Sequence, residues 1–188
     1  MTKKYDLHIH SIYSRDSSLK PEIILKIAKK RGLNGIAVTD HDSIKGGVMT
    51  SKLNKDKDFE VIVGSEIKTK HCEVLGYYLQ EKIKSKDLLE VLDKIKEQGG
   101  ISVIAHPFTI IPRLNLRYPL SEIKGKVDGL EALNGRAVFP FENKKAFDAA
   151  KKYKLAMTGS SDSHSRIEVG RAFTLFNGEL RTAIAKRK

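Results

Sequence analysis

The sequence predicts an α/β fold in which a largely parallel sheet closes into a barrel. Short apolar strands alternate with amphipathic helices along the chain, and this repeated order is typical of parallel sheets. The order alone fits an open doubly wound sheet as well as a barrel. Histidine or carboxylate groups end or follow the first, second, third, fifth and seventh strands, and only a closed barrel brings that many strand ends to one place.

The expected strands are short apolar runs: residues 5–10, 35–39, 61–67, 72–79, 101–105, 129–133, 155–158 and 172–176. The expected helices lie between them: residues 21–31, 46–53, 85–98, 121–124, 141–153 and 178–186. Pro21 suits the first position of its helix, and Gly32 is placed to end that helix. The helix at 85–98 has apolar residues at helical spacing, namely Leu88, Leu89, Leu92 and Ile95.

Length and composition are those of one folded domain spanning residues 1–188, with 40% hydrophobic and 31% charged residues. No apolar run approaches the ~20 residues that a membrane span needs, and the N-terminus lacks the apolar stretch of a signal peptide. The single cysteine, Cys72, excludes an internal disulfide framework. We therefore expect a cytoplasmic protein without a membrane partner.

The net charge of +12, from 35 Lys and Arg against 23 Asp and Glu, has two interpretations. A polyanionic partner such as a nucleic acid would be attracted by it. Lysine-rich helix exteriors in water explain it without any partner. The second interpretation is favoured, because the lysines of residues 26–31 and 82–96 are typical of helix exteriors and form no concentrated stripe.

All six histidines lie at or beside expected strand ends, most with an acidic residue or another histidine two positions away. His8 and His10 alternate along one strand, so both side chains point to the same face, together with Asp6. In a barrel that face is the interior. Imidazole and carboxylate together are metal ligands, and the sequence therefore predicts a metal site at the carboxyl ends of the strands.

His41 ends the second strand between Asp40 and Asp42, and these aspartates are suited to accept the N–H of a metal-bound imidazole. Glu66 closes the third strand. Its two oxygens can bridge two cations, which one imidazole nitrogen cannot do. Glu66 is thus the natural bridge if several ions are present.

The last two groups follow the fifth and seventh strands. His106 stands directly before Pro107, which stops its strand. Asp162 and His164 follow a turn of small residues that lets their loop lie close to a crowded metal centre.

These motifs resemble, in order, those of the PHP family, named for the polymerase and histidinol phosphatase domains. They read Asp6-Leu7-His8-Ile9-His10-Ser11, Thr39-Asp40-His41-Asp42 with Gly64-Ser65-Glu66, Ala105-His106-Pro107, and Gly159-Ser160-Ser161-Asp162-Ser163-His164. Each is short, but all of them in order across nearly the whole chain are a strong signal. The resemblance implies a distorted, TIM-like (β/α)₇ barrel in which two or three divalent ions (Zn, Mn or Fe) hydrolyse phosphoesters.

The resemblance also implies three metal positions, of which the first and the third share the Glu66 carboxylate. The first is held by His8, His10, Glu66 and Asp162. The second is held by Asp16, His41 and His164. The third takes Glu66, His106 and a residue of the fourth strand.

Two positions depart from the common family pattern. Many members have Ser-Asp-Gly after the His-x-His pair, whereas here the acidic residue comes one position later, as Asp16. On the fourth strand Glu73 stands where many members have a histidine. His71 lies two residues earlier, on the same expected strand face, and competes with Glu73 for the third ion. Cys72, between them, points to the opposite face and packs as a small apolar residue.

The implied reaction is in-line attack on phosphorus by a water that the ions activate. The residues expected to carry catalysis are Glu66, His41, Asp162 and His164, and the general acid is left open among the histidines and aspartates of the site. Arginines near strand ends are candidates for binding the substrate phosphate, namely Arg15, Arg113, Arg117, Arg136 and Arg166.

Three functions from different classes fit these residues. A phosphoesterase acting on small phosphomonoesters or nucleotides is favoured. A 3'-5' exonuclease-type phosphodiesterase acting on short oligonucleotides is the alternative, supported by the positive charge. A non-catalytic barrel that binds nucleic acid is disfavoured, because such a barrel is expected to have lost ligands and here almost every ligand is present. The sequence does not indicate an oligomeric state.

Overall fold

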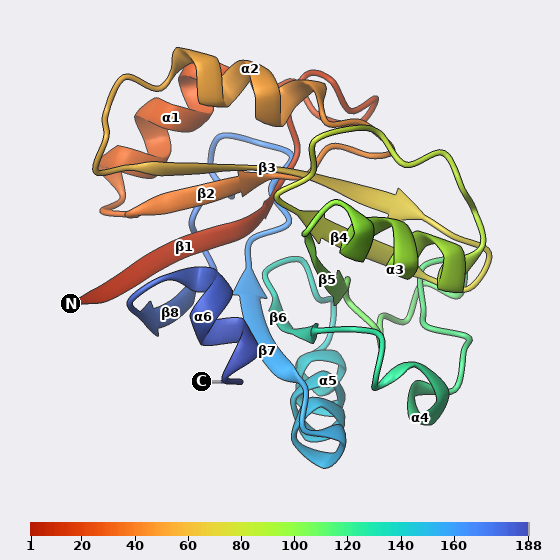
Figure 1. Cartoon of the computed structure of the whole chain (residues 1–188). Helices are drawn as coiled ribbons and strands as arrows, with labels where there is room; N and C mark the ends of the chain where they lie inside the picture. Colours follow the sequence, from red (N-terminus) through yellow and green to blue (C-terminus); the bar gives the residue numbers. More distant parts are fainter. Residues whose placement is uncertain (188) are drawn as a thin grey trace.

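The computed structural model describes residues 1–187. Its strands are β1 (Thr2–Ile9), β2 (Gly35–Val38), β3 (Glu60–Lys68), β4 (Glu73–Tyr77), β5 (Ile101–Ile104), β6 (Gly129–Asn134), β7 (Ala156–Ser160) and β8 (Thr174–Asn177). Its helices are α1 (Pro21–Lys30), α2 (Lys45–Leu53), α3 (Leu88–Glu97), α4 (Leu120–Ile123), α5 (Pro140–Tyr153) and α6 (Leu180–Ala185). Every expected element is present, with only its bounds shifted. Figure 1 shows the strands curving around a common interior, with α1 and α2 on the outer side of β2 and β3.

The strands form one sheet in the order β7-β6-β5-β4-β3-β2-β1-β8. The pairs within β1–β2–β3 and within β5–β6–β7 are parallel, as expected. In contrast, β4 is antiparallel to both β3 and β5, and β8 is antiparallel to β1. The short connection between Lys68 and Glu73 explains the reversal at β4, because a parallel pair needs a crossover of about a dozen residues or more.

The barrel closes where β7, at one end of this order, approaches β1, which is next to the other end. Ile9 forms an isolated parallel bridge with Ser163, and the backbone N–H of His10 donates to the Ser163 carbonyl at 2.9 Å. The buried Asp6 carboxylate closes the same seam by accepting from the backbone N–H and the hydroxyl of Ser161, at 2.9 and 2.5 Å. The sheet is a nearly closed barrel, and the distorted TIM-like architecture predicted from the sequence is confirmed.

Apolar clusters inside and outside the sheet hold the barrel together. One joins Leu7, Leu75 and Val103 from β1, β4 and β5, which are not all neighbours in the sheet, so it fills the interior. A second packs the apolar face of α1 against β2. A third packs α3 against β4 and β5. The α3 face contains the buried residues predicted from helical spacing: Leu88, Leu92 and Ile95.

Helix boundaries follow the sequence signals closely. Pro21 is the first residue of α1, and Gly32 takes a left-handed conformation, with φ of 68°, just beyond its end. The α3 helix starts later than expected because Asp87 caps it, accepting from the Glu90 N–H at 3.0 Å.

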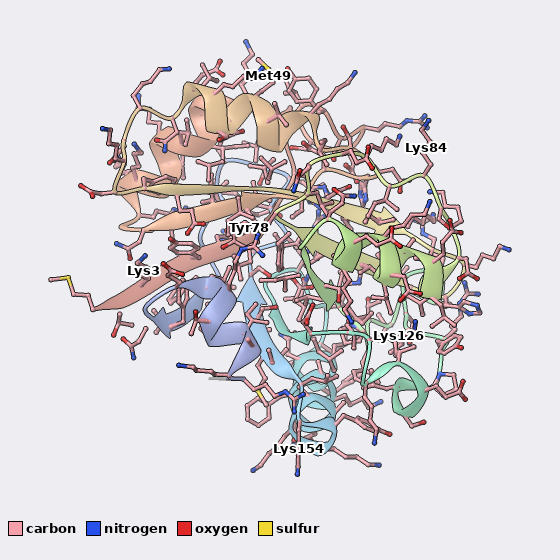
Figure 2. All side chains as sticks on the ribbon, viewed as in Figure 1. Lys3, Met49, Tyr78, Lys84, Lys126 and Lys154 are labelled. Carbon is pink, nitrogen blue, oxygen red and sulfur yellow. The ribbon has the colours of Figure 1, made fainter. Side chains whose placement is uncertain are left out.

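Lysine side chains are spread over the surface. Figure 2 shows Lys3, Lys84, Lys126 and Lys154 at well-separated places around the molecule. Some pair with carboxylates, as Lys126 does with Asp93 at 2.7 Å. These four lysines are not gathered in one place, as the solvated-surface interpretation expects. Among the helices of residues 1–187, none has the length and apolar character needed to cross a membrane.

Candidate metal centre

A first group of candidate ligands consists of His8, His10, Glu66 and Asp162. His8 Nε2 and His10 Nε2 are 3.0 Å apart. Glu66 Oε2 is 3.5 and 3.3 Å from these two nitrogens, and Asp162 Oδ1 is 3.5 and 3.4 Å from them. Ligand atoms about 2.1 Å from one ion stand ~3.0 Å apart at right angles and ~3.4 Å apart at the tetrahedral angle. These separations therefore fit neighbouring ligands of one divalent ion.

Buried hydrogen bonds turn both imidazoles toward this group. His8 Nδ1 is 3.0 Å from Glu131 Oε1, and His10 Nδ1 is 3.1 Å from the Ser14 hydroxyl. That hydroxyl donates to Asp40 Oδ1 at 3.0 Å, so it is free to accept from His10. With each Nδ1 engaged as a donor, each Nε2 keeps the lone pair that binds a metal.

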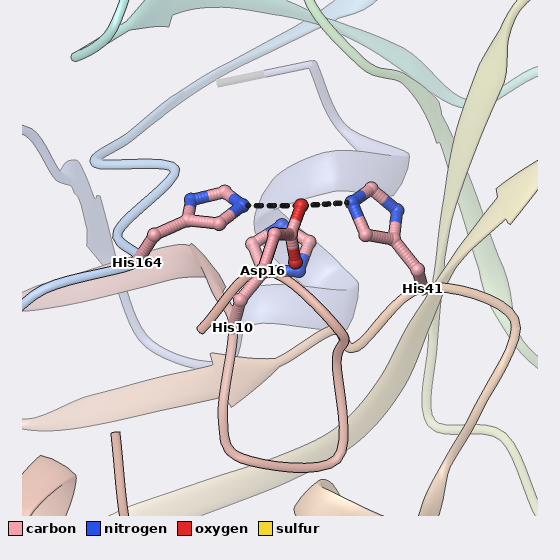
Figure 3. A group of neighbouring side chains, drawn as sticks. All are labelled: His10, Asp16, His41 and His164. Carbon is pink, nitrogen blue, oxygen red and sulfur yellow. Dashed lines mark hydrogen bonds and ion pairs between the residues drawn. The ribbon is translucent and has the colours of Figure 1, made fainter. Parts of the chain in front are cut away.

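A second group consists of Asp16, His41 and His164, beside His10. Figure 3 shows the Asp16 carboxylate between the two rings, with Oδ2 at 3.1 Å from His41 Nε2 and 3.2 Å from His164 Nε2. The His10 and His164 rings are stacked, with centroids 4.1 Å apart. One ligand atom from each of the four residues lies within 4.8 Å of the others. His10 thus stands between the first and second groups.

Glu66 connects the first group to a third. Glu66 Oε1 is 3.1 Å from His106 Nε2, and Glu66 Oε2 is 2.9 Å from His41 Nδ1. Glu73 Oε2 lies 3.6 Å from His106 Nε2 and, although buried, has no hydrogen-bond partner among residues 1–187. Burial of an unpartnered carboxylate oxygen is unfavourable. A cation between Glu66, Glu73 and His106 would satisfy it.

His71 does not share the strand face of Glu73, contrary to the prediction. The β4 strand begins at Glu73, so its alternation does not extend back to His71. Instead, His71 lies in the preceding turn, where its N–H donates to the Thr69 hydroxyl at 3.1 Å. Its ring packs edge-on against Tyr118, with centroids 5.2 Å apart. Cys72 is buried in the apolar cluster under α3, as expected.

The two aspartates beside His41 do not orient its ring, which is a second correction. Asp40 accepts from the Ser11 N–H at 2.6 Å, and Asp42 pairs with Lys86 at 2.7 Å. The two ring nitrogens of His41 instead face the carboxylates of Asp16 and Glu66. Successive residues at a strand end project to different sides, and this places residues 40 and 42 away from the side of His41.

Glu131, on β6, is the residue that the sequence interpretation missed. It is fully buried, and both its oxygens accept hydrogen bonds. Oε1 accepts from the Ser160 hydroxyl at 2.6 Å and contacts the His8 ring, while Oε2 accepts from the His106 backbone N–H at 2.8 Å and the Asn134 amide at 2.9 Å. It therefore holds a ligand of the first group and a ligand of the third. A charged residue inside an apolar strand is the signal that points to such a role.

Two candidate ligands have left-handed backbone conformations. The angle φ is 27° at His106 and 53° at Asp162, a region that residues other than glycine rarely occupy. Such strain persists where neighbouring bonds over-determine the conformation. The Glu131 carboxylate holds the His106 N–H, and the Asn134 amide donates to Asp162 Oδ2 at 3.2 Å. The geometry of the site thus shapes the backbone at these strand ends.

The packing of acids against imidazoles shifts their pKa values. Against the raising effect of burial, the surrounding histidines hold the pKa of Glu66 well below its usual range. Against the lowering effect of burial, Glu66 raises the pKa of His41 and of His106 to about 9. Burial and the charge of Glu66 raise the pKa of Glu73 to about 7. The metal-free cluster therefore retains protons at neutral pH that a cation must displace.

Metal binding is expected to release protons and to strengthen with rising pH. His41 and His106, with pKa values of about 9, are protonated at neutral pH, and only the neutral ring binds a cation. The apparent affinity should rise from neutral pH to about 9 and then level off. Calorimetric titration with Mn²⁺ in two buffers of different ionisation enthalpy counts the released protons. Equal heats in both buffers, with an affinity independent of pH, would contradict the assignment.

Among the candidate phosphate-binding arginines, Arg136 reaches the cluster. Its guanidinium lies against His164 Nδ1 and is 3.9 Å from Glu168. Arg117 instead donates to the Lys70 carbonyl at 2.6 Å, which fastens the loop between β5 and α4. The remaining candidates are exposed to solvent: Arg15, Arg113 and Arg166.

Replacing Glu131 with glutamine is expected to weaken metal binding by about 10- to 100-fold. Glutamine keeps the size of the side chain but presents an amide NH₂ to groups that now donate to an oxygen, so either His8 or His106 loses its support. Competition with a chelating dye measures the affinity. Glu142→Gln is the matched control, because Glu142 is also buried and accepts two backbone N–H groups. Equal affinity in wild type and Glu131→Gln would exclude this role.

A cluster of this composition at the strand ends of an α/β barrel defines a metal-binding barrel protein. The PHP domain model matches residues 6–161, and a second model, described as PHP-associated, matches residues 140–187. The protein belongs to the PHP domain family, as its motifs predict.

Two curated relatives illustrate the similarity. The uncharacterized protein MJ0417 of Methanocaldococcus jannaschii is 36% identical over 180 residues, which cover 93% of this chain and 70% of the relative. The 5'-3' exoribonuclease of Haemophilus influenzae is 32% identical over 117 residues, which cover 53% of this chain and 42% of the relative.

Two solved structures share the fold. One is a two-domain protein from Bacteroides vulgatus containing a predicted PHP-like metal-dependent phosphoesterase, with a TM-score of 0.82, 22% identity, and coverage of 100% of this chain and 63% of that one. The other is Endonuclease Q in complex with a 27-mer duplex substrate that has an abasic lesion at the active site. Its TM-score is 0.75 with 23% identity, and the match covers 99% of this chain and 57% of that one. This chain therefore spans less than two thirds of either structure.

Proposed function

We propose that the protein is a metal-dependent phosphoesterase that hydrolyses phosphate esters. The observation that carries the proposal is the position of Glu66. One of its oxygens faces His8, His10 and His41, and the other faces His106. A buried carboxylate placed among four imidazoles suits a cluster of two or three divalent ions, two of which would share it. Such ions activate a water and neutralise charge on a phosphoryl group.

The ligand assignment follows the three groups. The first ion is assigned to His8, His10, Glu66 and Asp162. The second is assigned to Asp16, His41 and His164. The third is assigned to Glu66, Glu73 and His106. Imidazole and carboxylate ligands without thiolate suit Zn, Mn or Fe.

The remaining polar residues hold this arrangement and bind the substrate. Ser14 and Glu131 keep the rings of His10 and His8 turned inward. Arg136, whose guanidinium lies against His164, binds the substrate phosphate. Glu66, His41, Asp162 and His164 act on the substrate through the ions that they hold.

The favoured substrates are small phosphomonoesters or nucleotides, and the alternative is an exonuclease-type phosphodiesterase acting on short oligonucleotides. The Haemophilus influenzae relative, a 5'-3' exoribonuclease, supports the alternative. The polarity of that relative is opposite to the one expected from the sequence. The direction of degradation is therefore determined with an end-labelled oligomer, by observing which end is released first. The expected cytoplasmic location stays a prediction.

The proposal is tested with Mn²⁺-loaded protein and a substrate panel of aryl phosphate, sugar phosphates, nucleotides and a short end-labelled oligonucleotide. Phosphate release that chelation abolishes supports a phosphomonoesterase, and stepwise shortening of the oligomer supports the exonuclease. No turnover of any substrate by fully metal-loaded protein would overturn both. Tight RNA binding independent of metal would then favour the non-catalytic barrel.

A further inference from the structure

Large apolar side chains are exposed on the loops that leave the carboxyl ends of the strands. These loops are the ones that follow β1, β5, β6 and β7, and three of them also contain or directly follow candidate metal ligands. Single exposed apolar residues are ordinary, but a concentration of them on functional loops marks a binding surface. The residues are Ile12, Tyr13, Ile110, Ile111, Val138, Phe139 and Ile167 in the loops, and Phe141 in the first turn of α5.

Phe139 and Phe141 form a stacked pair within this set. Their rings are stacked, with centroids 5.5 Å apart and planes 10° from parallel. The two side chains are nevertheless 47% and 45% exposed, so each ring contacts solvent as well as the other ring. The buried Glu142 fixes the backbone beneath them, because its Oε1 accepts from the Phe139 N–H at 2.7 Å. The pair is therefore held in place without being part of the core.

Short connections link this aromatic pair to the metal cluster from two sides. On one side Arg136, against His164, precedes Phe139 by three residues, which span at most ~11 Å of chain. On the other side Glu142 accepts from the Ile110 N–H at 3.2 Å, and His106 lies only a few residues before Ile110. Glu142 and His106 also line the same small cavity. These connections place the aromatic pair next to the loops that hold His164 and His106.

Two cationic side chains belong to the same region. Lys145 Nζ is 5.2 Å from the centre of the Phe141 ring, and the Arg136 guanidinium contacts His164 of the metal cluster. Aromatic faces next to cations suit a ligand that has both a planar ring and a phosphate. A sugar phosphate has no flat aromatic ring for stacking, and an apolar protein segment has no charge for these cations to neutralise. A nucleobase beside a phosphate has both.

We propose that Phe139 and Phe141 form a base-stacking site for the nucleotide next to the phosphate that the metal cluster attacks. The occupant is a single nucleic-acid strand or its terminal nucleotide. This inference rests on the proposed phosphoesterase function, which it deepens by naming the class of substrate. Stacking accepts any base, so the site gives affinity for nucleotides without sequence preference.

The test compares two labelled oligonucleotides that resist cleavage because their linkages are phosphorothioates. One has bases throughout, and the other has abasic residues at its end. Fluorescence anisotropy with metal-loaded protein should show that wild type binds the base-containing strand about tenfold or more tightly than the abasic one. In the Phe139→Ala/Phe141→Ala double variant this ratio should fall to near one. Phe147→Ala, which removes a 48% exposed ring from the same helix, should keep the wild-type ratio.

A Phe139→Leu/Phe141→Leu variant separates stacking from apolar contact and guards against a folding defect. Leucine keeps the apolar character but not the flat ring, so it should also lose the preference for bases while binding metal normally. Retention of the full ratio in either double variant would overturn the stacking site. If wild type prefers bases but hydrolyses no phosphate ester, the stacking site stands and the proposed function fails.

Discussion

Replacement of Glu66 by glutamine is expected to lower phosphoesterase turnover by about 10³-fold or more. The Glu66 carboxylate is the contact shared by the three ligand groups, since its oxygens lie 2.9 to 3.5 Å from four imidazoles. An amide cannot bridge two cations with two charged oxygens. Loss of even one ion removes several kcal/mol of transition-state stabilisation, and each ~1.4 kcal/mol is a factor of ten in rate. Steady-state kinetics and metal analysis measure both effects.

Glu60→Gln is the matched control for this experiment. Glu60 is on the same strand, at the opposite end of β3, and accepts hydrogen bonds from the hydroxyls of Tyr5 and Tyr78 at 2.7 and 3.1 Å. Its replacement removes one carboxylate charge without touching the cluster. If Glu60→Gln keeps normal activity and metal content while Glu66→Gln loses both, the effect is specific to the Glu66 carboxylate. Wild-type turnover in Glu66→Gln would refute the bridging role.

Asp162→Asn is expected to remove the first ion and to reduce turnover by about 10³-fold, for the same energetic reason. Asparagine tolerates the left-handed backbone found at this position, φ of 53°, so the substitution changes the charge with little added strain. Alanine at residue 162 would add that strain to the loss of a ligand. His10→Ala, which removes a neighbouring ligand atom 3.4 Å away, should have a comparable effect.

Asp42→Asn is a close control for Asp162→Asn. Asp42 is also an aspartate with a left-handed backbone, φ of 48°, and it pairs with Lys86 outside the cluster. This variant should keep full activity, because Asp42 does not orient the His41 ring. Activity that falls as far in Asp42→Asn as in Asp162→Asn would show that the effect is structural and not due to a lost ligand.

The sequence predicts the part of the site that depends on strand periodicity and strand ends. Alternation along β1 is enough to place His8 and His10 on one face. The same rule fails for His71 because β4 begins two residues later, and strand boundaries are the least certain feature of such predictions. Asp16 lies in a loop without periodicity, and the family resemblance identifies it as the candidate that the structure places between His41 and His164.

Long-range partners are the part that the sequence does not reveal. Glu131 is 123 residues from His8 and 25 from His106 in the chain, and only closure of the barrel brings the three together. The direction of β4 is a further example. A strand–helix order predicts parallel neighbours, whereas the short connection after β3 forces a hairpin. The short connection after β3 is the feature of the sequence that predicts this reversal.

Metal titration of chelator-stripped protein, followed by metal analysis and phosphate-release assays on the same samples, tests the central claim most directly. We expect two or three divalent ions per chain, with turnover restored as the ions are returned. The Glu66→Gln variant should bind fewer ions and regain no turnover. Full activity in stripped protein, or restored activity with less than one ion per chain, would contradict a phosphoesterase built on a shared Glu66 carboxylate.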